Sequence, residues 1–255
     1  MATWTYAIGD IHGMVHLLRE MIAKIFDHSK NAGVEPRFIF LGDYIDRGPD
    51  SKGVIDTLIS LQQTSNCICL KGNHEDLALN AVDNKNELWL WLRNGGDATL
   101  SSYPDDKISD DHIAWMRTLP VKFEMENHIF CHAGMLPYRT LDDQFDNHLM
   151  WVREPFLESP DPFFNVDHTG ARVNKFVTHG HTPWPYDDLR EERSNIRCNL
   201  DSGAFYTNVL TGAVFMEDNR GPPDEIFQVM SDAGREPGEF GIKGLRQTES
   251  GLWIA

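Results

Sequence analysis

The stretch Gly42-Asp43-Tyr44-Ile45-Asp46-Arg47-Gly48 follows an apolar run over residues 38–41 and is bounded by glycines. An apolar run that gives way to glycine and polar residues is typical of a buried strand followed by a turn. A second stretch of this kind, Gly9-Asp10-Ile11-His12-Gly13, follows the apolar residues 4–8. Carboxylate and imidazole groups on turns at strand ends are what a divalent metal site requires. The two stretches therefore predict the beginning of a metal site.

The residues around these two stretches alternate between strand and helix patterns. Residues 14–28 carry apolar side chains at helical spacing, and a second helical pattern covers residues 54–61. A third apolar run, residues 67–70, leads into Lys71-Gly72-Asn73-His74-Glu75. Strand, helix, strand, helix, strand is the order of a parallel sheet with right-handed crossovers.

The second half of the chain is different. Residues 75–119 are mostly helical in pattern, and Asn94-Gly95-Gly96 interrupts them either as a helix stop, which is favoured, or as a rim element of a site. Strand patterns then dominate, over residues 121–125, 128–131, 176–178, 196–200, 213–216 and 226–229. We therefore predict an α/β fold in which two mixed β-sheets pack as a central β-sandwich flanked by helices.

The domain organisation is expected to be simple. Residues 1–255 are predicted to form one domain, because no linker or repeat divides them. Residues 231–255 are rich in glycine and polar residues and are expected to be a loosely held tail whose apolar end docks. Residues 182–195 contain prolines and aromatics and are interpreted either as a substrate wall or as a loop packed on the sandwich.

Composition limits the functions open to the chain. The net charge of −16 disfavours a general nucleic-acid binder, which would present a basic face. Neither a signal peptide nor a run of about 18 apolar residues long enough to span a membrane is expected. Cys67 and Cys69 lack a paired CxxC pattern and are expected to be buried in a strand rather than to bind zinc. These features predict a reducing, cytoplasmic setting with no membrane partner.

A set of polar side chains at the ends of five predicted strands forms the candidate metal ligands. They are Asp10, His12, Asp43, Asn73, His132 and His181. Asp10 and His12 are two residues apart, so in extended backbone they are expected to point the same way. Two carboxylates, three imidazoles and one amide oxygen suit a pair of divalent cations, with one carboxylate free to bridge them.

These motifs, in their order and spacing, resemble the metallophosphoesterases of the phosphoprotein phosphatase type. The resemblance is closest to bacterial Ser/Thr protein phosphatases and their diadenosine-tetraphosphatase relatives. It rests on GDIHG, GDYIDRG, GNHE, the HAG at residues 132–134 and the GHTP at residues 180–183. The pair GDYIDRG and GNHE is the specific part, because broader metallophosphoesterases lack the Asp-Arg-Gly extension.

The resemblance implies a role for each residue that matches the family pattern. One metal would be held by Asp10, His12 and Asp43, and the other by Asp43, Asn73, His132 and His181. Arg47 and Arg153 would grip the phosphate oxygens. His74 would donate the proton, with Asp46 as its orienting partner. His179 ranks second as a ligand, because the family pattern places the ligand at the GHTP histidine.

The resemblance also implies metal-dependent hydrolysis of phosphate monoesters, with phosphoserine and phosphothreonine in proteins as the expected substrates. Small phosphoesters, diadenosine tetraphosphate cleaved symmetrically, and phosphotyrosine are the alternatives, and a metal-binding scaffold without catalysis is a remote one. Two divalent ions are implied, with manganese expected and iron or zinc admitted by the same ligands. The oligomeric state is left open by the sequence.

Overall fold

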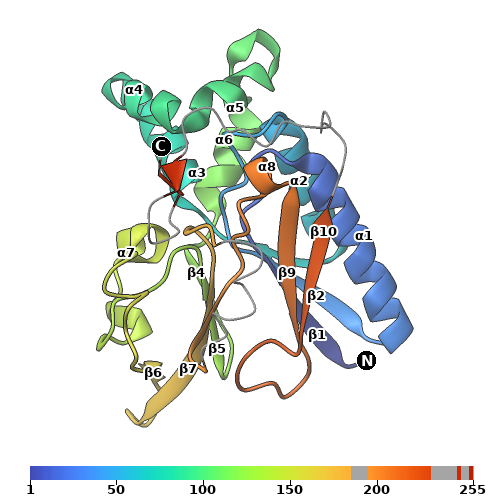
Figure 1. Cartoon of the computed structure of the whole chain (residues 1–255), viewed down its shortest axis with the longest axis vertical. Helices are drawn as coiled ribbons and strands as arrows, with labels where there is room; N and C mark the ends of the chain where they lie inside the picture. Colours follow the sequence, from blue (N-terminus) through green and yellow to red (C-terminus); the bar gives the residue numbers. More distant parts are fainter. Residues whose placement is uncertain (185–194, 231–245, 248–252, 255) are drawn as a thin grey trace.

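Three apolar runs near the start of the chain form the parallel strands β1 (Thr3–Ile8), β2 (Glu35–Phe40) and β3 (Asn66–Cys69) of the computed structural model (Figure 1). The register pairs Ile8 with Phe40 and Phe40 with Cys69, so the three strands end at the same edge. The turns that follow these strands therefore meet at one edge of the sheet. The structure describes residues 1–184, 195–230, 246–247 and 253–254.

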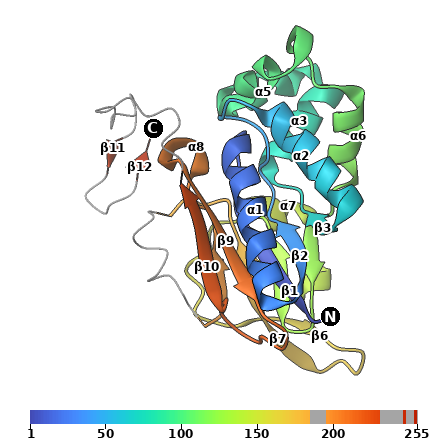
Figure 2. The ribbon, with the colours of Figure 1, turned by 90° about the vertical axis from the view of Figure 1, so that its right-hand side faces the viewer.

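Two further strands complete this first sheet. β9 (Val209–Phe215) lies antiparallel to β1, and β10 (Glu225–Met230) lies antiparallel to β9, giving the order β10-β9-β1-β2-β3. Helices α1 (Val15–Ala32) and α2 (Ser51–Thr64) cover its outer face (Figure 2). The helix predicted over residues 14–28 extends to Ala32, where Gly33 ends it in the left-handed conformation at φ 69°.

The second sheet contains the strands from the β-rich half. Its order is β4 (Lys122–Glu124), β5 (His128–Cys131), β7 (Arg172–His179) and β6 (Phe163–Val166), and β8 (Arg197–Asn199) also pairs with β7. The sequence pattern did not predict β6, which pairs with only the first half of β7 as the arm of a hairpin. The outer face of the second sheet is covered by α7 (Asp146–Trp151) and by the segments that precede and follow this helix. The two mixed sheets with helices outside confirm the predicted fold class.

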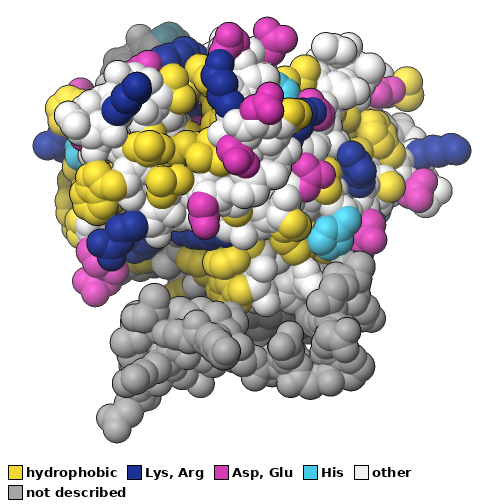
Figure 3. Space-filling view, turned by 90° about the horizontal axis from the view of Figure 1, so that it is seen from above, with side chains coloured by type: hydrophobic (Ala, Val, Ile, Leu, Met, Phe, Trp, Pro, Cys, Tyr) yellow, Lys and Arg dark blue, Asp and Glu magenta, His cyan; other side chains and the backbone are white. Residues whose placement is uncertain are grey.

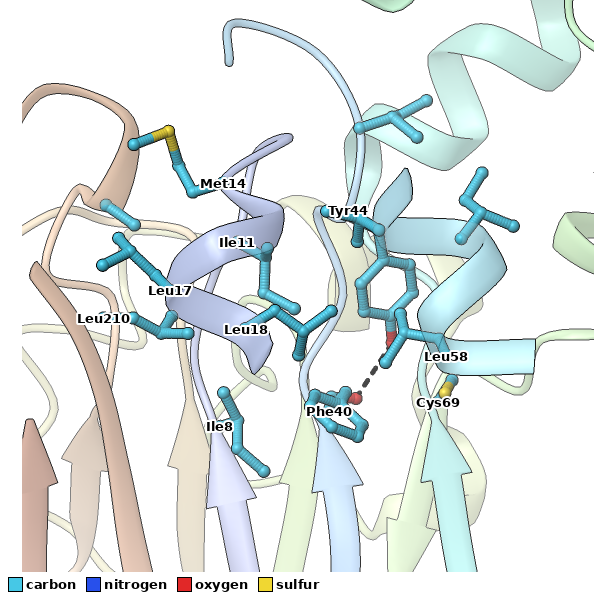
Figure 4. Close-up of a cluster of buried hydrophobic side chains, with 14 of the residues drawn as sticks. Ile8, Ile11, Met14, Leu17, Leu18, Phe40, Tyr44, Leu58, Cys69 and Leu210 are labelled. Carbon is cyan, nitrogen blue, oxygen red and sulfur yellow. Dashed lines mark hydrogen bonds between the residues drawn. The ribbon is translucent and has the colours of Figure 1, made fainter. Parts of the chain in front are cut away.

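Strands β1 and β2 bury side chains on both faces, because the first sheet packs against helices on one side and against the second sheet on the other. Tyr6, Phe38 and Phe40 belong to the cluster with the apolar side chains of α1 and α2. Figure 4 shows Phe40 and Tyr44 in this cluster beside Leu18 of α1 and Leu58 of α2. The alternate residues, Ala7 and Ile39, face the second sheet. Strands buried on both faces carry nearly continuous apolar sequences, which is the pattern that these runs show.

Residues 73–118 form a helical layer above the ends of the strands. It contains α3 (Asn73–Asp83), α4 (Leu88–Trp91), α5 (Asp97–Ser101) and α6 (Asp110–Thr118). The interruption predicted at Asn94-Gly95-Gly96 is a π-helical turn over Leu92–Gly96, with Gly95 at φ 101°, after which the helix resumes as α5. The expected helix stop is therefore only a local break. Gly95 also contacts the candidate site, because its carbonyl accepts the backbone N–H of Arg47.

The remaining sequence predictions concern two segments that the structure describes only in part, the cysteines and membrane-spanning helices. Most of the segments 182–195 and 231–255, including the apolar residue Leu252, lies outside the described ranges. Arg246–Gln247 (β11) and Trp253–Ile254 (β12) pair as short antiparallel strands. Cys67 and Cys69 lie on β3 with their sulfur atoms 3.8 Å apart, and all four cysteines are free. Within the described residues, no helix is long and apolar enough to cross a membrane.

Phe215 tests the packing between the sheets. It is 2% exposed and meets Phe130 of the opposite sheet edge-on, with ring centroids 5.6 Å apart. Phe215→Ala should lower the free energy of unfolding by about 3–5 kcal/mol, because it leaves a cavity between the sheets. Phe215→Leu should cost about 1–2 kcal/mol. Urea unfolding followed by circular dichroism measures both, and equal small losses would contradict this account of the core.

Candidate active site

The two stretches quoted first are joined by backbone hydrogen bonds. The carbonyl of Asp43 accepts the N–H groups of Ile11 and His12, at 3.1 and 2.9 Å, and the carbonyl of Tyr44 accepts that of Gly13. His12 has φ 44° and Asp43 has φ 54°, so both side chains leave a left-handed turn. The extended geometry expected for Asp10 and His12 is therefore wrong. The turns themselves aim these groups at the site.

Glu75 joins the turn that follows β2 to the turn that follows β3. It is fully buried, and its carboxylate accepts the N–H groups of Asp43 at 3.0 Å, Tyr44 at 2.8 Å and Gly72 at 2.8 Å. Gly72 has to be glycine here, because a Cβ would lie 2.2 Å from Asp43 Oδ1. Burial and the charge of Asp43 raise the pKa of Glu75 to about 7. Glu75 is the last residue of the GNHE motif, and its supporting role is not evident from the sequence pattern.

Asp43 lies at the centre of the candidate ligands. Two groups of buried side chains each offer ligand atoms within 4.8 Å of one another, and Asp43 belongs to both. The first group adds His12 and His74, and the second adds His132 and His181. Asn73 joins the second group, since its Oδ1 lies 2.9 Å from His132 Nε2 and 2.8 Å from His181 Nδ1.

Asp10 lies beside these groups rather than within them. Its carboxylate is 1% exposed and accepts the backbone N–H of His181, with the nearer oxygen at 3.1 Å. Burial, together with the charges of Asp201 and Asp43, raises its pKa well above the usual range. Burial likewise raises the pKa of Asp201 to about 6. Three carboxylates therefore share a buried region, an arrangement that needs compensating positive charge.

The histidine tautomers show that this region fits cations. His12 Nδ1 donates to the carbonyl of Ile45 at 2.7 Å, and His132 Nδ1 donates to that of Leu41 at 3.0 Å. In the neutral form of each ring the Nε2 lone pair then faces the Asp43 carboxylate, at 3.5 Å for His12 and 3.3 Å for His132. Arg47 Nη1 also lies 2.9 Å from His12 Nε2, whereas His132 Nε2 has a second acceptor, Asn73 Oδ1, at 2.9 Å. His181 Nε2 is buried without a partner. Acceptors that face one another are repulsive unless a cation lies between them, so the residues fit divalent metal ions.

His179 and His181 separate clearly in the structure. His179 is 1% exposed, and its ring lies edge-on to Phe156 with centroids 4.9 Å apart, among the apolar side chains outside the second sheet. Burial lowers the pKa of His179 to about 3. It is absent from both ligand groups, whereas His181 belongs to one. Of the two histidines, the structure places His181 with the other candidate ligands.

The candidate acid is held by a carboxylate. His74 Nδ1 lies 2.6 Å from Asp46 Oδ2, and both residues are buried. Its other nitrogen, Nε2, lies 3.9 Å from Asp43 Oδ2, which places His74 in the first group together with His12. A histidine held in this way presents one ring nitrogen to a reacting group in a fixed orientation.

Two exposed arginines contact candidate ligands. Arg47 Nη1 lies 2.9 Å from His12 Nε2, and its guanidinium covers the ring of Phe205, on α8 (Ala204–Thr207), at 5.1 Å. Arg153 Nη2 donates to the carbonyl of His181 at 3.4 Å. Loss of hydration and the neighbouring charge of Arg47 lower the pKa of Arg153. Two guanidinium groups held near one another form a site for an anion.

The surface above the strand ends does not repeat the net charge of the chain. Figure 3 shows basic, acidic and apolar side chains interspersed over the described part of this face. An anionic ligand therefore meets a mixed surface there rather than a uniformly acidic one.

A model of the calcineurin-like phosphoesterase family matches residues 3–205. The chain therefore belongs to this family of metal-dependent phosphoester hydrolases. The match contains every candidate site residue named above, from Asp10 to Phe205.

Individual relatives differ in the activity that their names state. Serine/threonine-protein phosphatase 1 of Salmonella typhimurium is 28% identical over 217 residues, which cover 81% of this chain and 89% of that protein. The symmetrical bis(5'-nucleosyl)-tetraphosphatase of Janthinobacterium sp. is 32% identical over 198 residues, which cover 78% of this chain and 64% of that protein. The crystal structure of a cold-active protein-tyrosine phosphatase from a Shewanella species has a TM-score of 0.55 at 17% identity, covering 84% of this chain and 77% of that one. At that identity the likeness shows the fold alone.

Glu75 gives a test of how the turns support the ligands. Glu75→Gln should weaken Mn²⁺ binding about tenfold. One end of the amide would present an N–H donor to backbone N–H groups that now donate to the Glu75 carboxylate, and the turn that carries Asp43 would shift. Titration calorimetry of the purified protein measures this affinity. Glu20→Gln, on the exposed face of α1, makes the same chemical change and should leave the affinity unaltered. Equal affinities for both variants would contradict the role assigned to Glu75.

Proposed function

We propose that the protein hydrolyses phosphate monoesters, and in particular phosphoserine and phosphothreonine in proteins. The observation that carries the proposal is the meeting of two opposite kinds of group. Buried acceptors gather around Asp43, and two exposed arginines contact the same candidate ligands, Arg47 at His12 Nε2 and Arg153 at the carbonyl of His181. A phosphate ester bound between metal ions and arginines satisfies both.

Each residue then has a chemical task. Asp10, His12 and Asp43 would hold one divalent ion, and the other would be held by Asp43, Asn73, His132 and His181. Such ions, when bound, supply positive charge and lower the pKa of water, which makes hydroxide available near neutral pH. Manganese is the ion proposed, and oxygen and imidazole ligands of this kind accept iron or zinc as well.

The arginines and the His74–Asp46 pair complete the reaction. Arg47 and Arg153 bind the phosphate oxygens, and a guanidinium suits this because it contacts two oxygens at once. As water adds to phosphorus, the bond to the ester oxygen breaks. An alkoxide is a poor leaving group, so His74 Nε2 gives it a proton. Asp46 accepts from Nδ1 and stabilises the protonated ring before transfer.

The choice of a phosphoprotein substrate rests on the relative matched over most of both lengths. The Salmonella phosphatase is covered over 89% of its length, whereas the Janthinobacterium tetraphosphatase is covered over 64%. The tetraphosphatase has the higher identity, 32% against 28%, which makes symmetrical hydrolysis of a dinucleoside tetraphosphate the second candidate.

A substrate panel tests this choice. With Mn²⁺, purified protein should release phosphate from phosphoserine and phosphothreonine peptides with a higher kcat/KM than it shows for phosphotyrosine peptides or diadenosine tetraphosphate. A preference for diadenosine tetraphosphate would support the second candidate instead. Absence of turnover on every substrate, with manganese, iron or zinc, would overturn the enzymatic proposal.

The acid role of His74 makes a separate prediction. His74→Ala should lower kcat for a phosphoserine peptide by about 10²-fold or more, since general acid catalysis contributes that much. The loss on p-nitrophenyl phosphate should be much smaller, because its leaving group needs little protonation. His168→Ala, in the exposed turn between β6 and β7, is the matched control and should behave as wild type. Equal losses on both substrates would rule out the acid assignment.

A further inference from the structure

Asp46 is held by more groups than its pairing with His74 requires. Its side chain is fully buried at φ 72°, on the turn that carries Arg47. The indole Nε1 of Trp91 donates to both carboxylate oxygens, each at 3.0 Å. The hydroxyl of Thr99 donates to Oδ1 at 2.6 Å. Trp91 and Thr99 both come from the helical layer above the sheets, about 50 residues further along the chain.

Thr99 holds Asp46 at two points. Its single hydroxyl proton goes to the carboxylate, which only accepts, and the same oxygen accepts the backbone N–H of Asp46 at 2.8 Å. Ser51 Oγ, 3.0 Å away, is then the donor to Thr99. Thr99 is fully buried, so water does not replace these bonds when they are lost. The hydroxyl therefore fixes the carboxylate of Asp46, and it shares the backbone N–H of Asp46 with Ser51 Oγ, which lies 3.1 Å from that nitrogen.

The π-helical turn brings these two donors together. A Cβ on Gly96 would lie 2.6 Å from the Trp91 ring, and a Cβ on Gly95 would lie 2.9 Å from Arg47 Cγ. Side chains at either position would push the ring or the guanidinium away. The break at Asn94-Gly95-Gly96 thus allows Trp91 and Thr99 to reach the Asp46 carboxylate while the backbone N–H of Arg47 donates to the carbonyl of Gly95.

We propose that Trp91 and Thr99 are positioning residues for proton donation by His74. They hold the Asp46 carboxylate in the one orientation in which it accepts from His74 Nδ1 and leaves Nε2 facing the site. This inference rests on the proposed phosphomonoesterase function. Its effect is confined to the step in which the leaving group is protonated.

The sharpest test removes one hydroxyl and keeps the shape of the side chain. Thr99→Val should lower kcat for a phosphoserine peptide about tenfold, the size expected for one hydrogen bond to a charged group. It should lower kcat for p-nitrophenyl phosphate by less than about twofold, since that leaving group needs little help. Thr99→Ser restores the hydroxyl and should recover the phosphoserine activity. Thr64→Val, which removes an exposed hydroxyl of α2, should change neither substrate.

A spectroscopic measurement reports the same contact without turnover. The proton on His74 Nδ1, in its 2.6 Å hydrogen bond to Asp46, should give a downfield imidazole resonance in the ¹H NMR spectrum. His74→Ala identifies that resonance by its disappearance. Thr99→Val should shift or broaden it, and Thr99→Ser should leave it in place. If Thr99→Val does not fold, Trp91→Phe, which removes the other donor, is judged by the same two measurements.

The outcomes separate this inference from the function on which it rests. A wild-type protein without phosphomonoesterase activity defeats the proposed function. An active wild type whose Thr99→Val variant loses equally on both substrates, loses nothing, or keeps an unchanged imidazole resonance overturns the positioning role alone. Selective loss on the phosphoserine peptide, with recovery by Thr99→Ser, supports it.

Discussion

Asp43 is the residue on which the rest of the site depends. Its carbonyl accepts two N–H groups from the turn after β1, its own N–H donates to Glu75 on α3, and its carboxylate belongs to both ligand groups. A single left-handed residue therefore joins the turns after three parallel strands. This is possible because the register aligns the last residues of the three strands, which brings the three turns to one edge of the sheet. The packing of the sheets serves to keep that edge fixed.

Much of this arrangement follows from local sequence. Apolar runs that stop at glycine predicted the strands, and a polar residue after each run predicted where the candidate ligands would gather. The alternating first half and β-rich second half predicted two sheets. β6 escaped prediction because a short hairpin arm, Phe163–Val166, owes its existence to pairing with β7 rather than to its own pattern. His12 reaches the site through a left-handed turn, which extended-strand geometry did not anticipate.

The supporting contacts were beyond sequence reasoning for a physical reason. Trp91 is 2% exposed, whereas Trp89, two residues earlier, is 59% exposed. A buried indole is common in a core, and nothing in its neighbours indicates that its N–H reaches a carboxylate 45 residues earlier. Nor does the sequence around Thr99 indicate that its hydroxyl reaches the carboxylate of Asp46. The one available signal was the glycine pair at positions 95 and 96, which marks close backbone and side-chain approach rather than a simple stop.

The strongly acidic chain and its anionic ligand are compatible because charge is arranged locally. Buried carboxylates around Asp43 carry much of the negative charge near the site, and burial raises the pKa values of Asp10 and Asp201. Divalent cations would offset those groups, and the guanidinium groups of Arg47 and Arg153 add positive charge beside His12 and His181. The same acceptors that would repel phosphate therefore recruit the cations that attract it. Net charge describes the approach of a substrate from a distance, whereas binding depends on these few groups.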